Sequence, residues 1–156
     1  MKKINFFIKL VKENKLELVE PSEEIMQSYI EKSESSLISA KILFEYNRLE
    51  EAVSMAYYSM YHLLIGVLFK IGIKCENHSA AIILMNKLFG LDNSYISSAK
   101  KERIDKQYYV DFNVTKKEVK DMIKEVEEFN NNLIDFKAKI NNKDIKKYRE
   151  KFKKLV

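Results

Sequence analysis

The chain has few of the residues that make turns and cross-links: its 156 residues include three glycines, one proline and one cysteine. So little glycine and proline excludes a loop-rich β-sandwich, a collagen-like repeat and a disordered linker. A single cysteine excludes an intramolecular disulfide framework and favours a reducing compartment. The first fifteen residues do not resemble a secretory signal, because lysines interrupt their apolar side chains. We therefore expect a cytoplasmic protein.

Histidine and glycine are too sparse for several kinds of chemical site. Cys75 and His78 stand three residues apart, but a structural zinc site needs a second such pair, which the sequence lacks. Neither histidine follows a glutamate by three residues, as a di-iron helical bundle requires. The sequence has no Gly-x-Ser-x-Gly and no glycine-rich phosphate loop. We expect no metal and no cofactor.

What the chain does have is apolar content, 46% of its residues, in helical patterns. Apolar residues recur at three- and four-residue steps in four segments, at about 22–47, 49–71, 79–89 and 115–140. Thr115 followed by Glu118 has the spacing of a capping box, which begins a helix. The first part of the segment 91–114 favours one more helix, through Ile96, Ala99 and Arg103, followed by QYYVDFN as a loop or frayed end. The predicted fold class is all-α: an antiparallel up-down bundle of four to five helices.

The most apolar segment, residues 52–73, is about as long as a bilayer crossing but contains His62, Lys70 and three tyrosines. We interpret it as the central helix of a bundle, with no membrane partner. The IKCENHS run that follows it is interpreted as a polar loop. Tyr58 and His62 stand four residues apart, so their side chains can meet on one helical face. The alternative is a core helix in which each tyrosine finds one buried partner.

The net charge of +5 is concentrated at the C-terminal end. Residues 137–156 hold nine Lys and Arg against two acidic residues, whereas the other residues hold 19 basic and 21 acidic groups. We divide the chain into an N-terminal extension at 1–20, a helical bundle at 21–141 and a basic tail at 142–156. The tail either contacts phosphates through counterion release or is a solvated, lysine-rich terminus. Its apolar residues Ile145, Tyr148, Phe152 and Leu155 have the spacing of a separate basic amphipathic helix.

Two stretches together resemble a known family. They are EEAVSMAYYSMYHLLIGVLFKIGIKCENHSAAI and KKERIDKQYYVDFNVTKKEVKDMIKEVEEFNNNL, and the resemblance extends over about residues 22–140. Their tyrosine pair, Gly-Ile turn, loop histidine and Arg-then-Tyr order are similar to the HEPN domain (higher eukaryotes and prokaryotes nucleotide-binding). The resemblance implies an antiparallel four-helix bundle that is commonly a homodimer. Many members are encoded beside a minimal nucleotidyltransferase and act as its toxin partner, and others are RNases or host-defence domains.

Catalytic members of this family carry Arg-x4–6-His, from which this chain departs. Arg103 is present, but Tyr108 stands five residues later where histidine is expected. Tyrosine titrates near ~10 and histidine near ~6.5, so Tyr108 is a poor base at neutral pH. Arg103 still suits bidentate phosphate binding, and His78 matches the family's loop histidine. The candidate catalytic residues are therefore Arg103, Tyr108 and His78.

The resemblance also implies nucleotide or RNA contacts. The candidate binding residues are Tyr58, His62 and Tyr109 in the bundle and Lys146, Lys147 and Arg149 in the tail. Tyr108 or Tyr109 is a candidate acceptor for nucleotidylation by a partner enzyme.

Two functions follow as hypotheses. The first is a toxin-like subunit that partners a minimal nucleotidyltransferase and acts on RNA or a nucleotide. The alternative is a non-catalytic homodimeric interaction module. The missing Arg-to-His spacing favours the alternative, and the basic C-terminus favours the first, so nuclease activity is left open.

Overall fold

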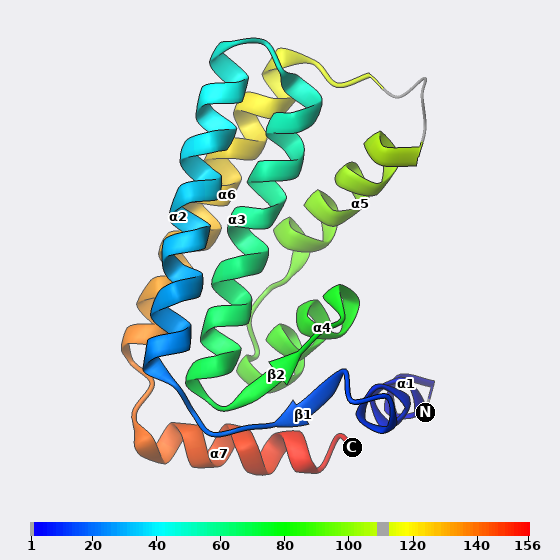
Figure 1. The fold of residues 1–156 in the computed structure, drawn as a ribbon, viewed down its shortest axis with the longest axis vertical. Coiled ribbons are helices and arrows are strands. Elements are labelled where there is room, and N and C mark those ends of the chain that lie inside the picture. The colour runs from blue at the N-terminus through cyan, green and yellow to red at the C-terminus, as the bar shows by residue number, and fades with distance from the viewer. Residues whose placement is uncertain (1, 109–112) are drawn as a thin grey trace.

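A computed structural model describes residues 2–108 and 113–156 of the chain, with side chains described for 6–103 and 113–156. The elements in these ranges are α1 (Lys2–Lys12), β1 (Leu16–Leu18), α2 (Glu23–Glu45), α3 (Leu49–Lys70), β2 (Ile73–Cys75), α4 (His78–Phe89), α5 (Ser94–Tyr108), α6 (Lys116–Ala138) and α7 (Asn142–Lys153). The predicted all-α class is confirmed. The helices α2, α3 and α6 lie side by side, and α5 packs at an angle on α3 (Figure 1).

The long helices begin at residues that the sequence marks. Ser22 caps α2 by accepting a hydrogen bond from the Ile25 amide at 3.1 Å. Thr115 does the same for α6, accepting from the Glu118 amide at 3.1 Å. These hydroxyls satisfy amide donors that a helix leaves free in its first turn. The predicted starts of both helices are confirmed.

The helix α3 is the centre of the fold. Its most apolar window is long enough to cross a membrane, but 72% of that window is buried against the other elements. The helix α2 approaches it closely at Gly66, where a Cβ atom would lie 3.1 Å from the Met26 carbonyl oxygen and 3.1 Å from the Cβ of Tyr29. The lack of a side chain at Gly66 therefore permits the tight α2–α3 contact.

Hydrogen bonds between buried side chains join α2, α3 and α6. The Ser33 hydroxyl donates to the Ser59 carbonyl at 2.6 Å, and the Ser59 hydroxyl donates to the Ser33 carbonyl at 2.8 Å. The Asn130 amide donates to the Ser59 hydroxyl at 3.0 Å. All three residues are buried, so each bond pairs a polar group that would otherwise be unsatisfied, whereas the buried Oδ1 of Asn130 has no partner among the described residues.

The run IKCENHS is only partly the loop that we predicted. Its first residues form β2, which pairs antiparallel with β1 in the register Leu16 with Cys75 and Leu18 with Ile73. Leu16 and Ile73 are fully buried, and this burial stabilises the short sheet. Strands of three residues are too short for an alternating pattern to show in the sequence.

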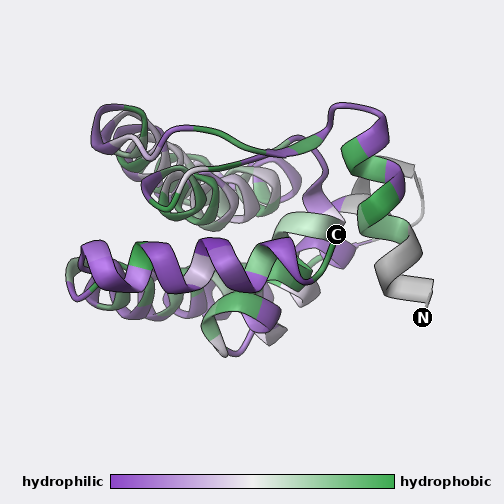
Figure 2. Ribbon diagram, turned by 90° about the horizontal axis from the view of Figure 1, so that it is seen from below, coloured by the Kyte–Doolittle hydropathy of each residue, from purple (hydrophilic) through white to green (hydrophobic). Residues whose placement is uncertain are grey.

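The C-terminal residues predicted as a tail form α7, which packs across one end of the bundle (Figure 1). Viewed from that end, α7 is mostly hydrophilic on its outer side (Figure 2). Its inner side buries Tyr148 and Phe152, and Phe152 is 2% exposed. Residues 142–153 therefore belong to the packed fold, because their apolar side chains recur at helical spacing.

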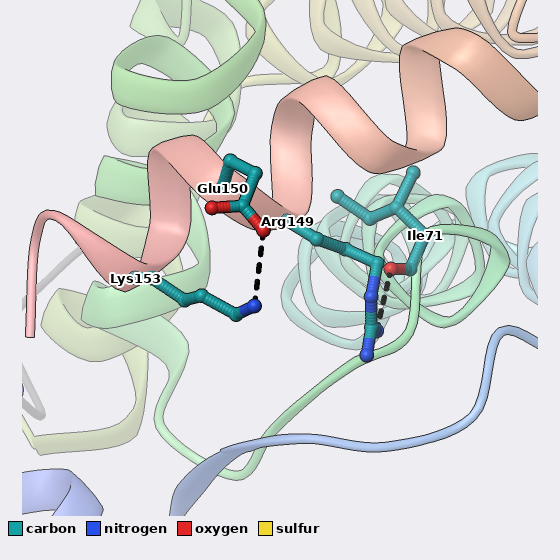
Figure 3. A network of polar contacts seen from close by, with 4 residues as sticks. All are labelled: Ile71, Arg149, Glu150 and Lys153. Carbon is teal, nitrogen blue, oxygen red and sulfur yellow. Dashed lines mark hydrogen bonds and ion pairs between the residues drawn. The ribbon is translucent and has the colours of Figure 1, made fainter.

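Arg149 fixes α7 to the rest of the molecule. One of its guanidinium nitrogens donates to the carbonyl oxygens of Val19 at 2.8 Å, Ile71 at 3.1 Å and Gly72 at 2.9 Å. Figure 3 shows the guanidinium of Arg149 beside the carbonyl of Ile71. Gly72 has a φ of +78°, and a Cβ there would collide with this guanidinium and with the Val19 carbonyl. The turn after α3 therefore requires glycine.

The helix α5 extends further than predicted. Residues 107 and 108 of the QYYVDFN run are its last two residues, and residues 109–112 lie outside the described part of the chain.

Candidate functional site

Aromatic and basic side chains from α3, α4 and α5 meet on one side of the central helix. We call this group the aromatic–basic cluster. It consists of Tyr57, Tyr58, Tyr61, His62, His78, Ser79, Lys100 and Arg103.

Arg103 reaches α3 from α5. Its guanidinium donates a hydrogen bond to the Tyr58 hydroxyl at 2.7 Å. The guanidinium carbon lies 4.9 Å from the centre of the Tyr58 ring and 5.7 Å from that of Tyr57, within the range of cation–π attraction. The two adjacent tyrosines thus hold the cation in place.

His78 contacts Tyr57 and Tyr61 from α4. Its Nδ1 lies 2.7 Å from the Tyr57 hydroxyl, and its ring stacks on Tyr61 at a centroid distance of 3.8 Å and an interplanar angle of 11°. Asn77 caps α4 by accepting from the Ala80 amide, which makes His78 the first helical residue rather than a loop residue. Arg103 and His78, which are 25 positions apart in the sequence, therefore both contact Tyr57.

Burial and neighbouring cations keep His78 uncharged. Desolvation lowers its pKa from 6.5 to about 4, and the charges of Arg103 and Lys100 act in the same direction. Burial raises the pKa of the Tyr57 hydroxyl above its usual value, and the Tyr61 hydroxyl beside it adds to this effect. At neutral pH the cluster therefore holds a neutral imidazole and neutral phenols beside fixed positive charge.

His62 lies on the other side of Tyr58. The two rings stack at 5.6 Å with an interplanar angle of 21°, so the two side chains meet through their rings, whereas the Tyr58 hydroxyl accepts from Arg103. Desolvation and the charge of Lys32 lower the pKa of His62. Its Nδ1 is buried and has no hydrogen-bond partner among the described residues.

Sequence reasoning missed two polar members of the cluster, Ser79 and Lys100. The Lys100 ammonium donates to the Ser79 hydroxyl at 3.0 Å, close to the first turn of α4. Lys100 stands three residues before Arg103, a spacing that puts both cations on one face of α5. This three-residue spacing from Arg103 was the feature of the sequence that could have identified Lys100 as a member of the site.

Comparison with known proteins decides the family. The model of the HEPN domain matches residues 26–154, most of the chain. The chain belongs to the HEPN domain family. The family assignment thus confirms the resemblance seen in the sequence.

Two relatives are similar to this HEPN chain. A UPF0332 protein of Pyrococcus horikoshii is 34% identical over 54% of this chain and 56% of its own length, so that match spans little more than half of the relative. A protein of Methanocaldococcus jannaschii named "Putative toxin" is 32% identical over 68% of this chain and 84% of its own length.

The other predicted site residues of the HEPN domain lie apart from the cluster or outside the described side chains. Tyr108 is the last residue of α5, its side chain is outside the described part, and Tyr109 is wholly outside it. Lys146 and Lys147 are exposed on α7. Arg149 is engaged with the three backbone carbonyls described above, so its guanidinium is not presented to solvent as a tail cation would be.

The cluster has the groups needed to hold a phosphate and to exchange a proton. Arg103 and Lys100 supply positive charge and N–H donors, which suit phosphate oxygens. His78 supplies a neutral imidazole, which accepts a proton at one ring nitrogen. Cys75 is a poor nucleophile, because burial raises the pKa of its thiol to about 11.

Proposed function

We propose that this HEPN chain is a toxin-like protein that acts on RNA at the aromatic–basic cluster and partners a minimal nucleotidyltransferase. One observation carries the proposal: a guanidinium and a neutral imidazole, from two different helices, both contact the same tyrosine, Tyr57. The printed name of the Methanocaldococcus relative supports the toxin-like role.

In this proposal Arg103 and Lys100 bind a backbone phosphate, and His78 takes the proton of the adjacent 2′-hydroxyl. That role needs the tautomer in which Nδ1–H donates to the Tyr57 oxygen and leaves Nε2 free to accept. Removing the proton lets the 2′-oxygen attack the phosphorus, and the 5′-oxygen leaves with a proton from solvent. The reaction needs no metal, because Arg103 offsets the charge on the phosphate.

A bound phosphate would make His78 a better base. The cations of Arg103 and Lys100 contribute to its lowered pKa, and a phosphate beside them cancels part of their effect. We expect the His78 pKa to rise from about 4 towards 6.5 when RNA binds, which an NMR titration of the imidazole can measure.

Cleavage of total RNA by the purified protein tests this role of the cluster. We expect Arg103→Ala and His78→Gln each to slow cleavage at least ~100-fold. Arg48→Ala is the matched control, since Arg48 is an exposed arginine paired with Glu51 and does not belong to the cluster. Cleavage that is unchanged by Arg103→Ala would refute the proposed role of Arg103.

The alternative is a non-catalytic interaction module, which the tyrosine at position 108 favours over catalysis. On this hypothesis the wild-type chain binds RNA or its partner without cleaving RNA. A native pull-down tests the partner itself, because a co-purifying nucleotidyltransferase is expected on the first proposal. Its absence when both proteins are co-expressed would contradict the partnership.

A further inference from the structure

A groove runs between α5 and α6, on a face of α5 different from the one that carries Lys100 and Arg103. It consists of two hollows of about 250 and 200 Å³, and Tyr95 lines both. The helix α5 leans away from the axis of the other long helices in Figure 1. On α6 the lining extends from Glu118 to Leu133. At 1.5 Å per residue this length is about 22 Å, or four helical turns.

The floor of the groove is apolar. The apolar lining residues are Val53, Met60, Ala99, Val114, Val119 and Met122 in the larger hollow and Met85, Leu91, Phe129 and Leu133 in the smaller one. Leu91, Val114 and Met122 are partly exposed, and the others are buried beneath them. Three of the ten are methionines, whose flexible side chains adapt to different partners.

The lining is acidic and contains no cation. Its carboxylates are Asp92, Glu102, Glu118, Asp121, Glu125 and Glu128. Neither hollow is lined by a Lys or Arg among the described residues, although the whole chain has a net charge of +5. The ion pairs found among the described side chains also leave these six carboxylates out.

The crowding of like charges is unfavourable in the free protein. Partial burial raises the pKa of Glu125, and Asp121, Glu128 and Glu102 raise it further by repulsion. A cationic partner would relieve this repulsion. An RNA or an anionic membrane would increase it, since both carry negative charge.

We propose that the groove docks an amphipathic helix of a second protein, with apolar side chains on one face and Lys or Arg along its edges. The apolar floor would receive the apolar face, as in other helix-in-groove complexes, and the carboxylates would pair with the flanking cations. The basic helix α7 of a second copy is a poorer match, because its apolar residues Tyr148 and Phe152 are already buried. This inference does not depend on the cluster's action on RNA.

A designed peptide tests the proposal on the full chain. The probe is a fluorescein-labelled, helix-forming 15-residue peptide with leucines on one face and lysines along both edges. Its twin has glutamate in place of every lysine. Fluorescence anisotropy is expected to show binding of the lysine peptide, weaker binding at higher salt, and at least ~10-fold weaker binding of the twin.

Matched variants locate the binding site. Asp121→Asn with Glu125→Gln removes two rim charges, and we expect it to weaken binding about tenfold. Glu127→Gln with Asp135→Asn removes two charges from the same helix outside the groove, and should leave binding unchanged. Ser98→Trp keeps the charges but fills the larger hollow, and should abolish binding.

Three results would overturn the proposal. The first is no binding of the lysine peptide up to about 1 mM, the limit of weak affinity. The second is equal binding by the two double variants, which would mean non-specific attraction. The third is a dimer of the chain alone, in sedimentation, that Ser98→Trp breaks, because it would assign the groove to a second copy.

Discussion

The two sides of α3 use polar side chains differently. Towards α2 and α6, Ser33, Ser59 and Asn130 bond to one another and are buried. Towards α4 and α5, Tyr58 and His78 are only partly buried and lie beside cations. The first arrangement uses its hydrogen bonds for packing, whereas the second leaves positive charge and an imidazole partly exposed. One side of α3 therefore serves the packing of the fold, and the other carries the proposed site.

The largest expected effect on stability is at the side of α3 that faces α2 and α6. Ser59→Val removes the hydroxyl that bonds to the Ser33 carbonyl and to the Asn130 amide. The buried Asn130 amide then lacks its partner, whereas the Ser33 carbonyl keeps the hydrogen bond of its own helix, so we expect a loss of about 1–3 kcal/mol. Urea unfolding measures it. The exposed Ser35→Val should change stability by less than about 0.5 kcal/mol, and equal losses would contradict the comparison.

On the side of α3 that faces α4 and α5, we expect a large change in the pKa of His78. Arg103→Gln removes a cation that helps to lower the pKa of His78, so we expect this pKa to rise above about 4. The NMR shifts of the imidazole protons report it. Lys101→Gln on the neighbouring exposed lysine is the control and should leave the His78 pKa unchanged. A fall in the pKa of His78 in the Arg103→Gln variant would show that the charge of Arg103 does not lower the pKa of the imidazole.

The same titration predicts a pH dependence of folding. The pKa of His78 is lowered in the folded state, and that of His62 is lowered too, so the unfolded chain binds more protons between about pH 6.5 and 4. Their contribution to stability is complete above pH 6.5 and is lost as the pH falls towards 4. His78→Gln should flatten this part of the profile in urea unfolding. If the free energy of unfolding of His78→Gln changed with pH as steeply as that of the wild type, this result would contradict the lowered pKa of His78.

The smallest expected effect is on the outer side of α7. Lys146→Ala and Lys147→Ala should change stability by less than about 0.5 kcal/mol, because both residues are exposed. If these lysines contact RNA, each replacement should lower the salt dependence of binding by about one counterion. Salt titrations of RNA binding measure it. If the dependence of RNA affinity on salt is unchanged in both variants, RNA contacts residues other than Lys146 and Lys147.

Sequence patterns predicted the long helices well, because periodic apolar residues and capping side chains act locally. Thr115 and Ser22 mark helix starts through bonds within one turn. The pairing of β1 with β2 was missed, because each strand is three residues long and its partner is more than fifty residues away. The role of Arg149 was also missed, since its carbonyl partners come from two distant segments.

The site was predicted in its parts but not in its assembly. Tyr58 and His62 are four residues apart on one helix, so their stacking follows from helical geometry. The meeting of Arg103 with His78 around Tyr57 depends on how α5 and α4 pack on α3, which no local pattern specifies. The signal for Lys100 was present in its spacing from Arg103.

The contacts of Arg149 also have a practical consequence for how the protein is handled. Both the segment after β1 and the turn after α3 are fastened to α7 through a single guanidinium, and Gly72 leaves the space that it fills. Cutting the chain before α7 would therefore remove this shared donor and uncover the core that Tyr148 and Phe152 cover, and any activity lost would report damage to the scaffold. Point substitutions on the outer lysines are the safer way to ask what the C-terminal residues touch.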